Sequence, residues 1–572
     1  MKINEGSGNG ALSSQVALVI GVTGHRDLVP DEVPMLRARL ERFFNELAAQ
    51  FPDLPLQIVG SLAQGADSLV AEVAQGLGHK VINILPMSSA AYRDDFDEAG
   101  ARTLAQLIEQ NETHVLPHAD LSEDTERDLL YERAGVFIAA HCHLLLALWD
   151  GKYNQAVGGT AHIVDFHQRG ASLLTDHEGL RSRIDVADDE SDLVFQLACS
   201  RLSAGRPVSP LVPGEGYWFS RDEIKPRSDK MPERYQHVFA SQAQFNRDVA
   251  DLGDFDDAHT LEPEAADSAC ARQCAAIRAM FRASDTLARR FQQRTLLALR
   301  LTIFSALFAG FCFIGFADLT GSRIAIAGYF VFVALALGSY WVANRGGWRQ
   351  RYLDYRVLAE GLRVQYYWAL AGVTLPNFGH YAHDCFLRGR ELELGWIRNA
   401  MRSAGLRVNL FENRSTKELD RVMQHWIGDS TNGQLAYFVN GIGGKTRAHL
   451  RSRRMVAGCF VASLVTAGVL FIGRETLPES IENLLIAFTG LLPLIAAARQ
   501  NYAYRVAERE LLGQYGHMQK IFTTAAHLLH QTHDTNEQRA ILHDLGEAAL
   551  DESGQWLLRQ RERPLPGGEP MN

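Results

Sequence analysis

The sequence predicts a chain of two parts: an N-terminal α/β domain built on a parallel sheet, and a C-terminal α-helical transmembrane domain with two helical hairpins and long cytoplasmic helices. Two observations lead to this prediction. In the N-terminal third, short apolar runs alternate with amphipathic stretches, a pattern typical of parallel α/β sheets. In the C-terminal half, four apolar stretches occur as two pairs. The 572 residues leave room for several domains.

Six apolar runs in the N-terminal domain are predicted strands. They lie at 16–21, 56–59, 80–85, 115–116, 143–148 and 193–197. Amphipathic helices are expected at 31–50, 68–77 and 161–169. Three of the strands are followed by glycine-containing turns that open a helix. Because the carboxyl ends of parallel strands meet at one edge of the sheet, where ligands bind in open α/β folds, these turns indicate a binding site.

The residues of these turns suit a phosphate-containing ligand. Glycines allow close backbone approach, and a helix N-terminus favours negative charge. His25 and Arg26 would add charge-assisted contacts, while Asp67 or Asp150 would accept ribose hydroxyls. Glycine turns also serve as ordinary helix caps, so the prediction depends on three of them sharing one edge. The predicted ligand-binding residues are Thr23, Gly24, His25, Arg26, Gly60, Ser61, Gly65, Asp67, Asp150, Gly158, Gly159 and Thr160.

The same residues resemble a known family. The pattern from Gly60 to Asp67, with Glu72 further along the helix, is similar to the Rossmann-like SLOG superfamily, which groups the DNA-processing protein DprA with the cytokinin-activating LOG enzymes. The likeness extends to Thr23–Arg26 and to Asp150 with Gly158–Thr160, and covers about residues 16–170. The resemblance implies a nucleotide-binding domain.

One position departs from the LOG pattern. LOG enzymes carry a glutamate three residues after the Gly-Thr pair, where it serves cleavage of a base–ribose bond, and here that position is Ile163. Without that carboxylate, a binding site is favoured over a hydrolase, and we assign no catalytic residue. A membrane-anchored nucleotide N-glycosidase or phosphoribohydrolase-like enzyme using Glu72, Asp67 or Asp165 stays an alternative.

The four apolar stretches lie at 301–317, 324–343, 455–472 and 484–498. Their lengths approach or reach what a helix needs to cross a hydrocarbon core of about 30 Å. The last stretch is short and carries Pro493, so a buried core helix stays an alternative for any single stretch. Arginines cluster outside the two pairs, whereas each hairpin loop contains one. Because an excess of Arg and Lys marks the cytoplasmic side, both termini are expected in the cytoplasm.

A short phrase recurs after each pair. Residues 355–360 read YRVLAE and residues 504–508 read YRVAE, each followed by an amphipathic stretch. We interpret this as an internal duplication that produces two stalk helices. The first copy, with Arg363, resembles the SLATT effector domains, two-helix membrane modules associated with SLOG proteins and prokaryotic nucleotide signalling; the second copy lacks one residue. The resemblance implies an antiviral effector at a bacterial inner membrane.

Composition and charge narrow the classes of function that remain. A net charge of −10 disfavours nucleic-acid binding. The seven cysteines are scattered without paired CxxC motifs, which is typical of reduced thiols, and the His141-Cys142-His143 run reads as structural, so no metal site is predicted. The polar, Gly/Ser-rich start contains no signal-peptide pattern.

The expected boundaries follow from these patterns. They are a disordered N-terminus at 1–15, the SLOG-like domain at 16–220, a helical linker at 221–298, the first transmembrane hairpin plus stalk at 299–375, a cytoplasmic helical insert at 376–450, the second hairpin plus stalk at 451–558 and a disordered tail at 559–572.

Together these expectations describe a membrane effector gated by a nucleotide or ADP-ribose-type molecule. We expect no required cofactor, a homo-oligomer in contact with membrane lipid, and a partner enzyme that makes the signal. A membrane scaffold whose nucleotide site only stabilises the fold is a third hypothesis.

Overall fold

The computed structural model describes residues 14–117, 127–153, 156–169, 192–221, 227–253, 261, 273–373, 381–387, 392–410, 415–473 and 477–562. Most of the two predicted disordered termini, 1–15 and 559–572, lies outside the described residues. The chain forms two compact units. The sheet unit comprises Met1–Ser284, Val357–Leu419 and Leu542–Gly554, and the helical unit comprises Asp285–Arg356, Asp420–Ile541 and Gln555–Asn572. The predicted insert at 376–450 is therefore divided between them.

A seven-stranded mixed sheet forms the centre of the sheet unit, in the order β4-β3-β2-β1-β5-β6-β7. Strands β1 to β6 run parallel to one another, as predicted, and β7 is antiparallel to β6. The strands are β1 (Leu18–Gly24), β2 (Leu56–Gly60), β3 (Lys80–Leu85), β4 (Glu112–Val115), β5 (Leu144–Trp149), β6 (Val194–Ala198) and β7 (Gly216–Phe219).

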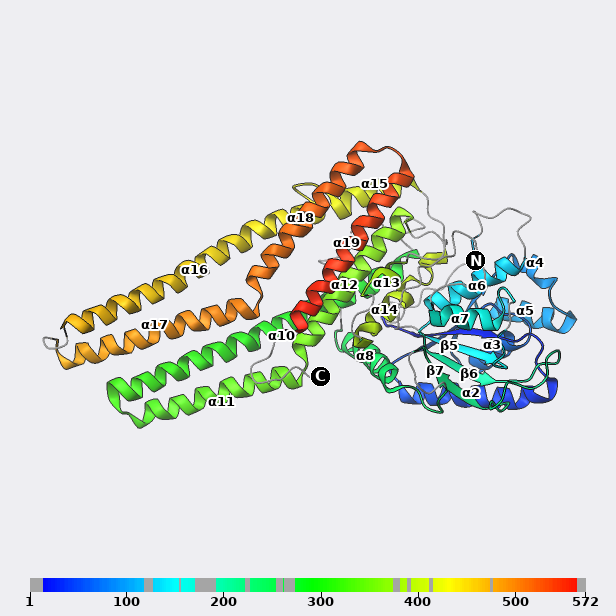
Figure 1. Cartoon of the computed structure of the whole chain (residues 1–572), viewed down its shortest axis with the longest axis horizontal. Coiled ribbons are helices and arrows are strands. Elements are labelled where there is room, and N and C mark those ends of the chain that lie inside the picture. Colours follow the sequence, from blue (N-terminus) through cyan, green and yellow to red (C-terminus); the bar gives the residue numbers. More distant parts are fainter. Residues whose placement is uncertain are drawn as a thin grey trace. The chain divides into compact units, whose positions relative to one another are not determined.

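Helices cover both faces of this sheet, which explains why its strands are apolar runs rather than alternating patterns. Helix α2 (Val33–Gln50) lies on one face, and α6 (Arg127–His141) and α7 (Thr160–Arg169) lie on the other (Figure 1). Helix α2 buries a stripe at helical spacing that includes Leu36, Leu40 and Leu47.

The strand order creates one topological switch point. The chain builds β1 to β4 outward in one direction and then returns to place β5 on the other side of β1. A crevice at the carboxyl ends of β1 and β5 is therefore expected, and ligands bind there in open α/β sheets.

Further helices complete the two units. They are η1 (Pro30–Glu32), α3 (Ala66–Gly76), α4 (Ser89–Arg93), α5 (Glu98–Gln110), α8 (Glu233–Ala250), α12 (Trp348–Ala371), α13 (Ala382–Cys385), η4 (Leu392–Leu394), α14 (Gly395–Gly405), η5 (Val408–Leu410), α15 (Thr416–Val422), η6 (Met423–Ile427) and α19 (Thr535–Arg561).

Part of the predicted insert packs on the sheet unit. In α14, Asn399 donates a hydrogen bond to Gln242 of α8 at 3.4 Å. After α14, Arg407 binds both carboxylate oxygens of Glu112 on β4, at 2.6 and 2.8 Å. The segment 357–419 therefore belongs with the sheet, although 295 residues separate Arg407 from Glu112.

The helical unit is built from long helices. They are α10 (Ala275–Ile314), continued by the π-helical η3 (Gly315–Thr320), α11 (Arg323–Arg345), α16 (Gly433–Gly473), α17 (Glu479–Arg505) and α18 (Glu508–Gln531). Among the described residues, four helical stretches are long and apolar enough to cross a membrane: Ala275–Ala317, Arg323–Arg345, Gly433–Gly473 and Glu479–Gln531. They contain all four predicted spans. Figure 1 shows α10 with α11, and α16 with α17, as antiparallel hairpins.

Large apolar side chains on these helices face outward. Phe471 is 88 % exposed and Leu464 is 76 % exposed, values that in water would mark a severe aggregation hazard. Similar side chains include Phe304, Phe308, Phe311, Ile324, Phe330 and Val461. Their exposure is that of a surface which lipid covers.

Small and polar residues join the membrane helices to one another. The hydroxyls of Thr302 and Ser339 lie 2.8 Å apart across the first hairpin. Ser463 donates to the Thr489 carbonyl across the second, at 3.0 Å. A Cβ on Gly310 would lie 2.4 Å from Leu494, so this glycine allows close approach of α10 and α17.

The repeated phrase occupies different structural positions in its two copies. Residues 355–360 lie inside α12, whereas residues 504–508 span the break between α17 and α18, with Ala507 in the left-handed conformation at φ 59°. Glu508 pairs with Arg499 at 2.7 Å, and Glu360 pairs with Arg363 at 2.5 Å. Each copy thus leads into a long helix, α12 or α18, but at a different point of that helix, and the internal duplication stays a prediction.

Candidate functional site

The predicted turns do meet at one edge of the sheet. Gly24 ends β1 and lies in register with Leu148 of β5, and Gly60 ends β2. Asp150 follows β5 directly. Because these strands are parallel, the segments that follow them leave the sheet on the same side.

The switch point between β1 and β5 is filled by two of the predicted residues. His25 Nε2 lies 3.1 Å from Asp150 Oδ1, and the Asp150 amide donates to the same nitrogen at 3.1 Å. Both side chains are buried. Burial lowers the pKa of His25, while the nearby Asp150 carboxylate opposes that change. Thr23 is also buried. In this structure His25 and Asp150 bind each other, and a ligand would have to displace that contact to use either.

Gly24 and Gly65 allow the turn after β1 to pack closely against the turn before α3. Gly65 has φ 94°, and a Cβ there would lie 2.4 Å from the Arg26 carbonyl oxygen. A Cβ on Gly24 would lie 2.3 Å from the Ala66 side chain. The Ala66 amide, at the start of α3, donates to the His25 carbonyl at 3.0 Å. These glycines bring the β1 turn against the N-terminus of α3, and that contact occupies one of the amides predicted for phosphate.

A polar cluster lies beside these turns, formed by Arg26, Ser61, Asp67, Tyr92 and Tyr131; we call it the edge cluster. The Arg26 guanidinium lies 4.3 Å from the centre of the Tyr131 ring, as a cation–π contact. Ser61 donates to Asp67 at 2.7 Å. The rings of Tyr92 and Tyr131 lie 5.9 Å apart. Arg26 is exposed and Ser61 and Tyr131 are half-buried, so solvent reaches the cluster.

The edge cluster contains incompletely compensated polar groups. Burial raises the pKa of Asp67 to about 6, although the Ser61 hydrogen bond and the Arg26 charge oppose this. Burial also raises the pKa of Tyr92. Among the described residues, no hydrogen bond of ordinary geometry satisfies the buried Tyr92 hydroxyl. A ligand that reached the cluster could supply partners to these groups, which makes them candidates for ligand contact.

Backbone strain occurs at the same place. Leu62, directly after Ser61, has φ 59°, in the left-handed region that a branched, buried side chain rarely occupies. Strained residues of this kind persist where the surrounding structure holds them and are concentrated at functional sites.

The third predicted turn lies against α6. Gly158 has φ 70°, and a Cβ there would lie 2.9 Å from the Glu132 amide and 3.2 Å from Tyr131 Cβ. Its amide donates to His162 Nδ1 at 3.0 Å. Thr160 is buried at the start of α7, and Gly159 is half-buried. The turn thus adjoins Tyr131 of the edge cluster.

The carboxylates considered for catalysis have different surroundings. Glu72 is held by Arg37 at 2.6 Å, and both side chains are exposed by more than a third. Ile163, at the position of the LOG glutamate, is buried in the core, where it packs tightly on Gly135. A buried carboxylate is instead supplied by Glu132, whose Oε1 lies 3.4 Å from His162 Nε2.

Sequence reasoning missed Tyr92, Tyr131 and Glu132. The helices that carry them, α4 and α6, were not predicted. Helix α6 is buried on most sides and its apolar residues follow no clear helical period, so periodicity offered no signal.

Comparisons with known proteins add no assignment. No protein-family model matches the chain, and a search of curated proteins found no significant match.

Proposed function

We propose that the protein is a nucleotide-sensing membrane effector that binds a nucleotide or ADP-ribose-type signal at the edge cluster and perturbs the inner membrane of a bacterium. The observation that carries the proposal is the edge cluster itself. It joins a solvent-accessible arginine, a buried carboxylate and an unsatisfied tyrosine hydroxyl at the carboxyl edge of a parallel sheet, in a chain with four lipid-compatible helices.

The chemistry of the cluster fits the parts of a nucleotide. Arg26 would bind a phosphate with paired N–H groups, and the Tyr131 ring would then be free to stack on a base or ribose. Asp67 would accept ribose hydroxyls. The amides of Gly159 and Thr160, at the start of α7, would add donors for a second phosphate.

Gating requires that the ligand bind two arrangements of the protein with different affinity. The Arg26–Tyr131 contact supplies a local difference, because a phosphate that binds Arg26 competes with the aromatic ring. The resemblance of the two parts to SLOG and SLATT domains supports an antiviral role, with a partner enzyme as the source of the signal. In this proposal the protein is a homo-oligomer in contact with lipid, and both termini are cytoplasmic.

The binding step is tested with the full chain purified in detergent. Small molecules that copurify are identified by mass spectrometry, and their affinity is measured for the wild type and for Arg26→Ala. We expect the substitution to weaken binding at least tenfold, since charge-assisted hydrogen bonds are lost. The matched control is Arg102→Ala, an exposed arginine of α5 whose Nε donates to the Glu98 carbonyl of the same helix at 3.2 Å.

Two outcomes would contradict the proposal. One is a nucleotide whose affinity is unchanged in Arg26→Ala. The other is equal loss of affinity in Arg26→Ala and Arg102→Ala, which would indicate a general effect of removing positive charge.

The second candidate function is a nucleotide N-glycosidase, and the observation that favours it is the buried Glu132–His162 pair beside Gly158. A carboxylate held there would be suited to stabilise positive charge developing on a ribose. Incubation with NAD or nucleoside monophosphates, followed by assay for released base, separates the two functions. Release of base that Glu132→Gln abolishes would favour the enzyme.

A further inference from the structure

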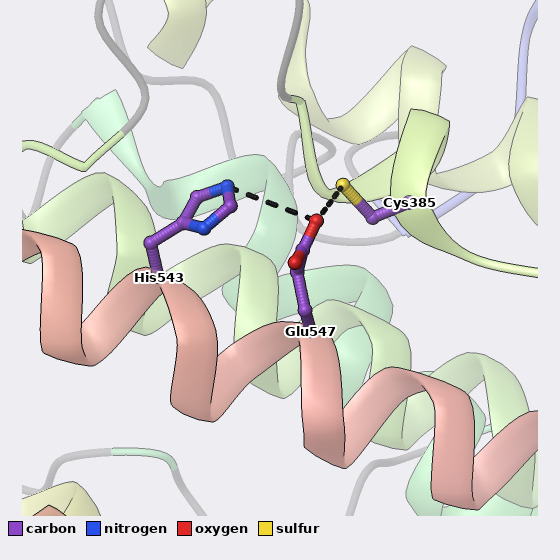
Figure 2. A group of neighbouring side chains, drawn as sticks. All are labelled: Cys385, His543 and Glu547. Atoms are coloured by element: carbon purple, nitrogen blue, oxygen red, sulfur yellow. Dashed lines mark hydrogen bonds and ion pairs between the residues drawn. The ribbon is translucent and has the colours of Figure 1, made fainter.

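A second cluster of reactive side chains lies on the sheet unit, outside the edge cluster. It consists of Cys385 at the end of α13 and of His543 and Glu547 on α19 (Figure 2). One potential ligand atom from each residue lies within 4.8 Å of the other two. Cys385 Sγ lies 3.4 Å from Glu547 Oε1, and His543 Nε2 lies 4.0 Å from the same oxygen.

The two distances to Glu547 can be compared with those of a tetrahedral zinc site. Zinc binds sulfur at about 2.3 Å and nitrogen or oxygen at about 2.0–2.2 Å, so neighbouring ligand atoms lie roughly 3.3–3.7 Å apart. The sulfur–oxygen distance already fits. The nitrogen–oxygen distance must shorten by a few tenths of an ångström, which rotation of the exposed Glu547 side chain allows.

The two ligands on α19 are held in place by a specific contact. They are one helical turn apart and therefore share a face. Gly546 lies between them, and a Cβ there would be 2.1 Å from the Trp368 indole nitrogen. That nitrogen donates to the Leu542 carbonyl at 3.0 Å. The helix can approach Trp368 this closely only because residue 546 is glycine.

The His543 ring is oriented on both sides. It stacks on Trp368 with centroids 4.8 Å apart and an interplanar angle of 16°. Its Nδ1 lies 3.5 Å from Asp544 Oδ1 and its Nε2 faces Glu547 (Figure 2). A carboxylate beside the second ring nitrogen is the outer-shell arrangement that orients histidine ligands in metal sites.

We propose that Cys385, His543 and Glu547 bind a zinc ion, with water as the fourth ligand. A mixed thiolate, imidazole and carboxylate set favours zinc over magnesium or calcium, which prefer oxygen alone. The ion would fasten the C-terminal helix to α13, joining residues 162 positions apart in sequence. The proposal is independent of the proposed nucleotide function.

The test uses the full chain in detergent, without a histidine tag, dialysed against dilute zinc and then against buffer. Zinc per chain is measured by inductively coupled plasma mass spectrometry for the wild type, Cys385→Ser, Glu547→Gln and the control Cys459→Ser, a thiol of α16. We expect about one zinc per chain in the wild type and in Cys459→Ser. Cys385→Ser and Glu547→Gln should lose at least nine-tenths of it.

Two further measurements distinguish loss of the zinc site from misfolding of a variant. Zinc should raise the thermal unfolding temperature of the wild type and of Cys459→Ser only, because a ligand of the folded state stabilises it. Cobalt in place of zinc should give a thiolate charge-transfer absorption that Cys385→Ser lacks. Absence of zinc from the wild type, or equal zinc in folded Cys385→Ser and Glu547→Gln, would overturn the proposal and leave a thiol–carboxylate hydrogen bond only.

Discussion

Asp67 is a buried carboxylate with a folded-state pKa of about 6, raised by burial against the effect of Ser61 and Arg26. Its unfolded pKa is about 3.9. The folded state therefore holds the proton more tightly, and the contribution of Asp67 to stability falls as pH rises from about 4 through 6. A polar group kept at a stability cost is typical of functional sites.

We predict that Asp67→Asn raises the thermal unfolding temperature, relative to the wild type, by roughly 2–6 °C more at pH 8 than at pH 5. The asparagine cannot ionise, so it avoids the cost that the carboxylate incurs at high pH. Differential scanning fluorimetry in detergent measures the change. A difference between Asp67→Asn and the wild type that is the same at pH 5 and pH 8 would contradict the prediction.

Gly159 provides a test of the third turn. A Cβ there would meet the Ala156 carbonyl oxygen at 3.2 Å, so a side chain fits with a small adjustment. We predict that Gly159→Glu folds but binds nucleotide at least tenfold more weakly, because its carboxylate repels phosphate. Gly159→Ala is the control for steric effects. Calorimetric titration that shows equal affinity for wild type and Gly159→Glu would place the third turn outside the binding site.

At the scale of single residues, the sequence predicted which turns share an edge of the sheet but not the contacts that their side chains make. The turns at Gly24, Gly60 and Gly158 meet as expected. However, no local pattern could reveal that His25 and Asp150 bind each other or that Tyr131 lies over Arg26. Those contacts join elements more than 100 residues apart, which a pattern read along the chain does not relate.

At the scale of elements, the pair of Arg407 and Glu112 joins the segment after α14 to β4. Burial alone would raise the pKa of Glu112, but the hydrogen bonds from Arg407 hold it well below its usual range. Stability from this pair is thus present above the unfolded pKa of about 4.3 and is lost as pH falls below it.

We predict that Arg407→Ala lowers stability at pH 7 by about 1–2 kcal/mol, since a bidentate, half-buried pair is broken. Arg247→Ala breaks the more exposed pair with Asp53, at 2.6 Å, and should cost less than about 1 kcal/mol. Urea unfolding at pH 7 compares them. Equal effects of the two substitutions would mean that the segment after α14 is not anchored through Glu112.

Gly310 tests the packing between the two membrane hairpins. We predict that Gly310→Leu lowers the thermal unfolding temperature in detergent by several degrees, because the new side chain must displace Leu494. Gly338→Leu on α11 is the control, since nothing lies within 4 Å of a Cβ there. If both variants behave alike, the close approach of α10 and α17 does not stabilise the protein.

At the scale of helices and strands, the fold was largely predictable wherever the sequence followed a single helical or strand pattern. Strand β3 has the predicted bounds, and all four predicted spans lie within long apolar helices. The predictions failed where tertiary packing decides. The antiparallel β7 follows a proline-rich stretch without strand alternation, and the YRVLAE phrase does not show where its helix begins.

At the scale of the whole molecule, one chain contains a parallel-sheet unit with an accessible polar cluster and a helical unit with outward-facing apolar side chains. In the proposed function, the sheet unit binds a polar ligand and the helical unit lies in lipid. Neither property alone indicates an effector. Their presence in the same polypeptide is the basis of the proposed gating.

The most direct test of gating is release of a trapped dye from liposomes that contain the purified protein. A nucleotide shown by titration to bind the wild type is added, and release is compared with that from Gly159→Glu liposomes. We predict rapid release with the wild type and none with the variant. A nucleotide that binds the wild type tightly, at the edge cluster, and releases no dye would contradict the account.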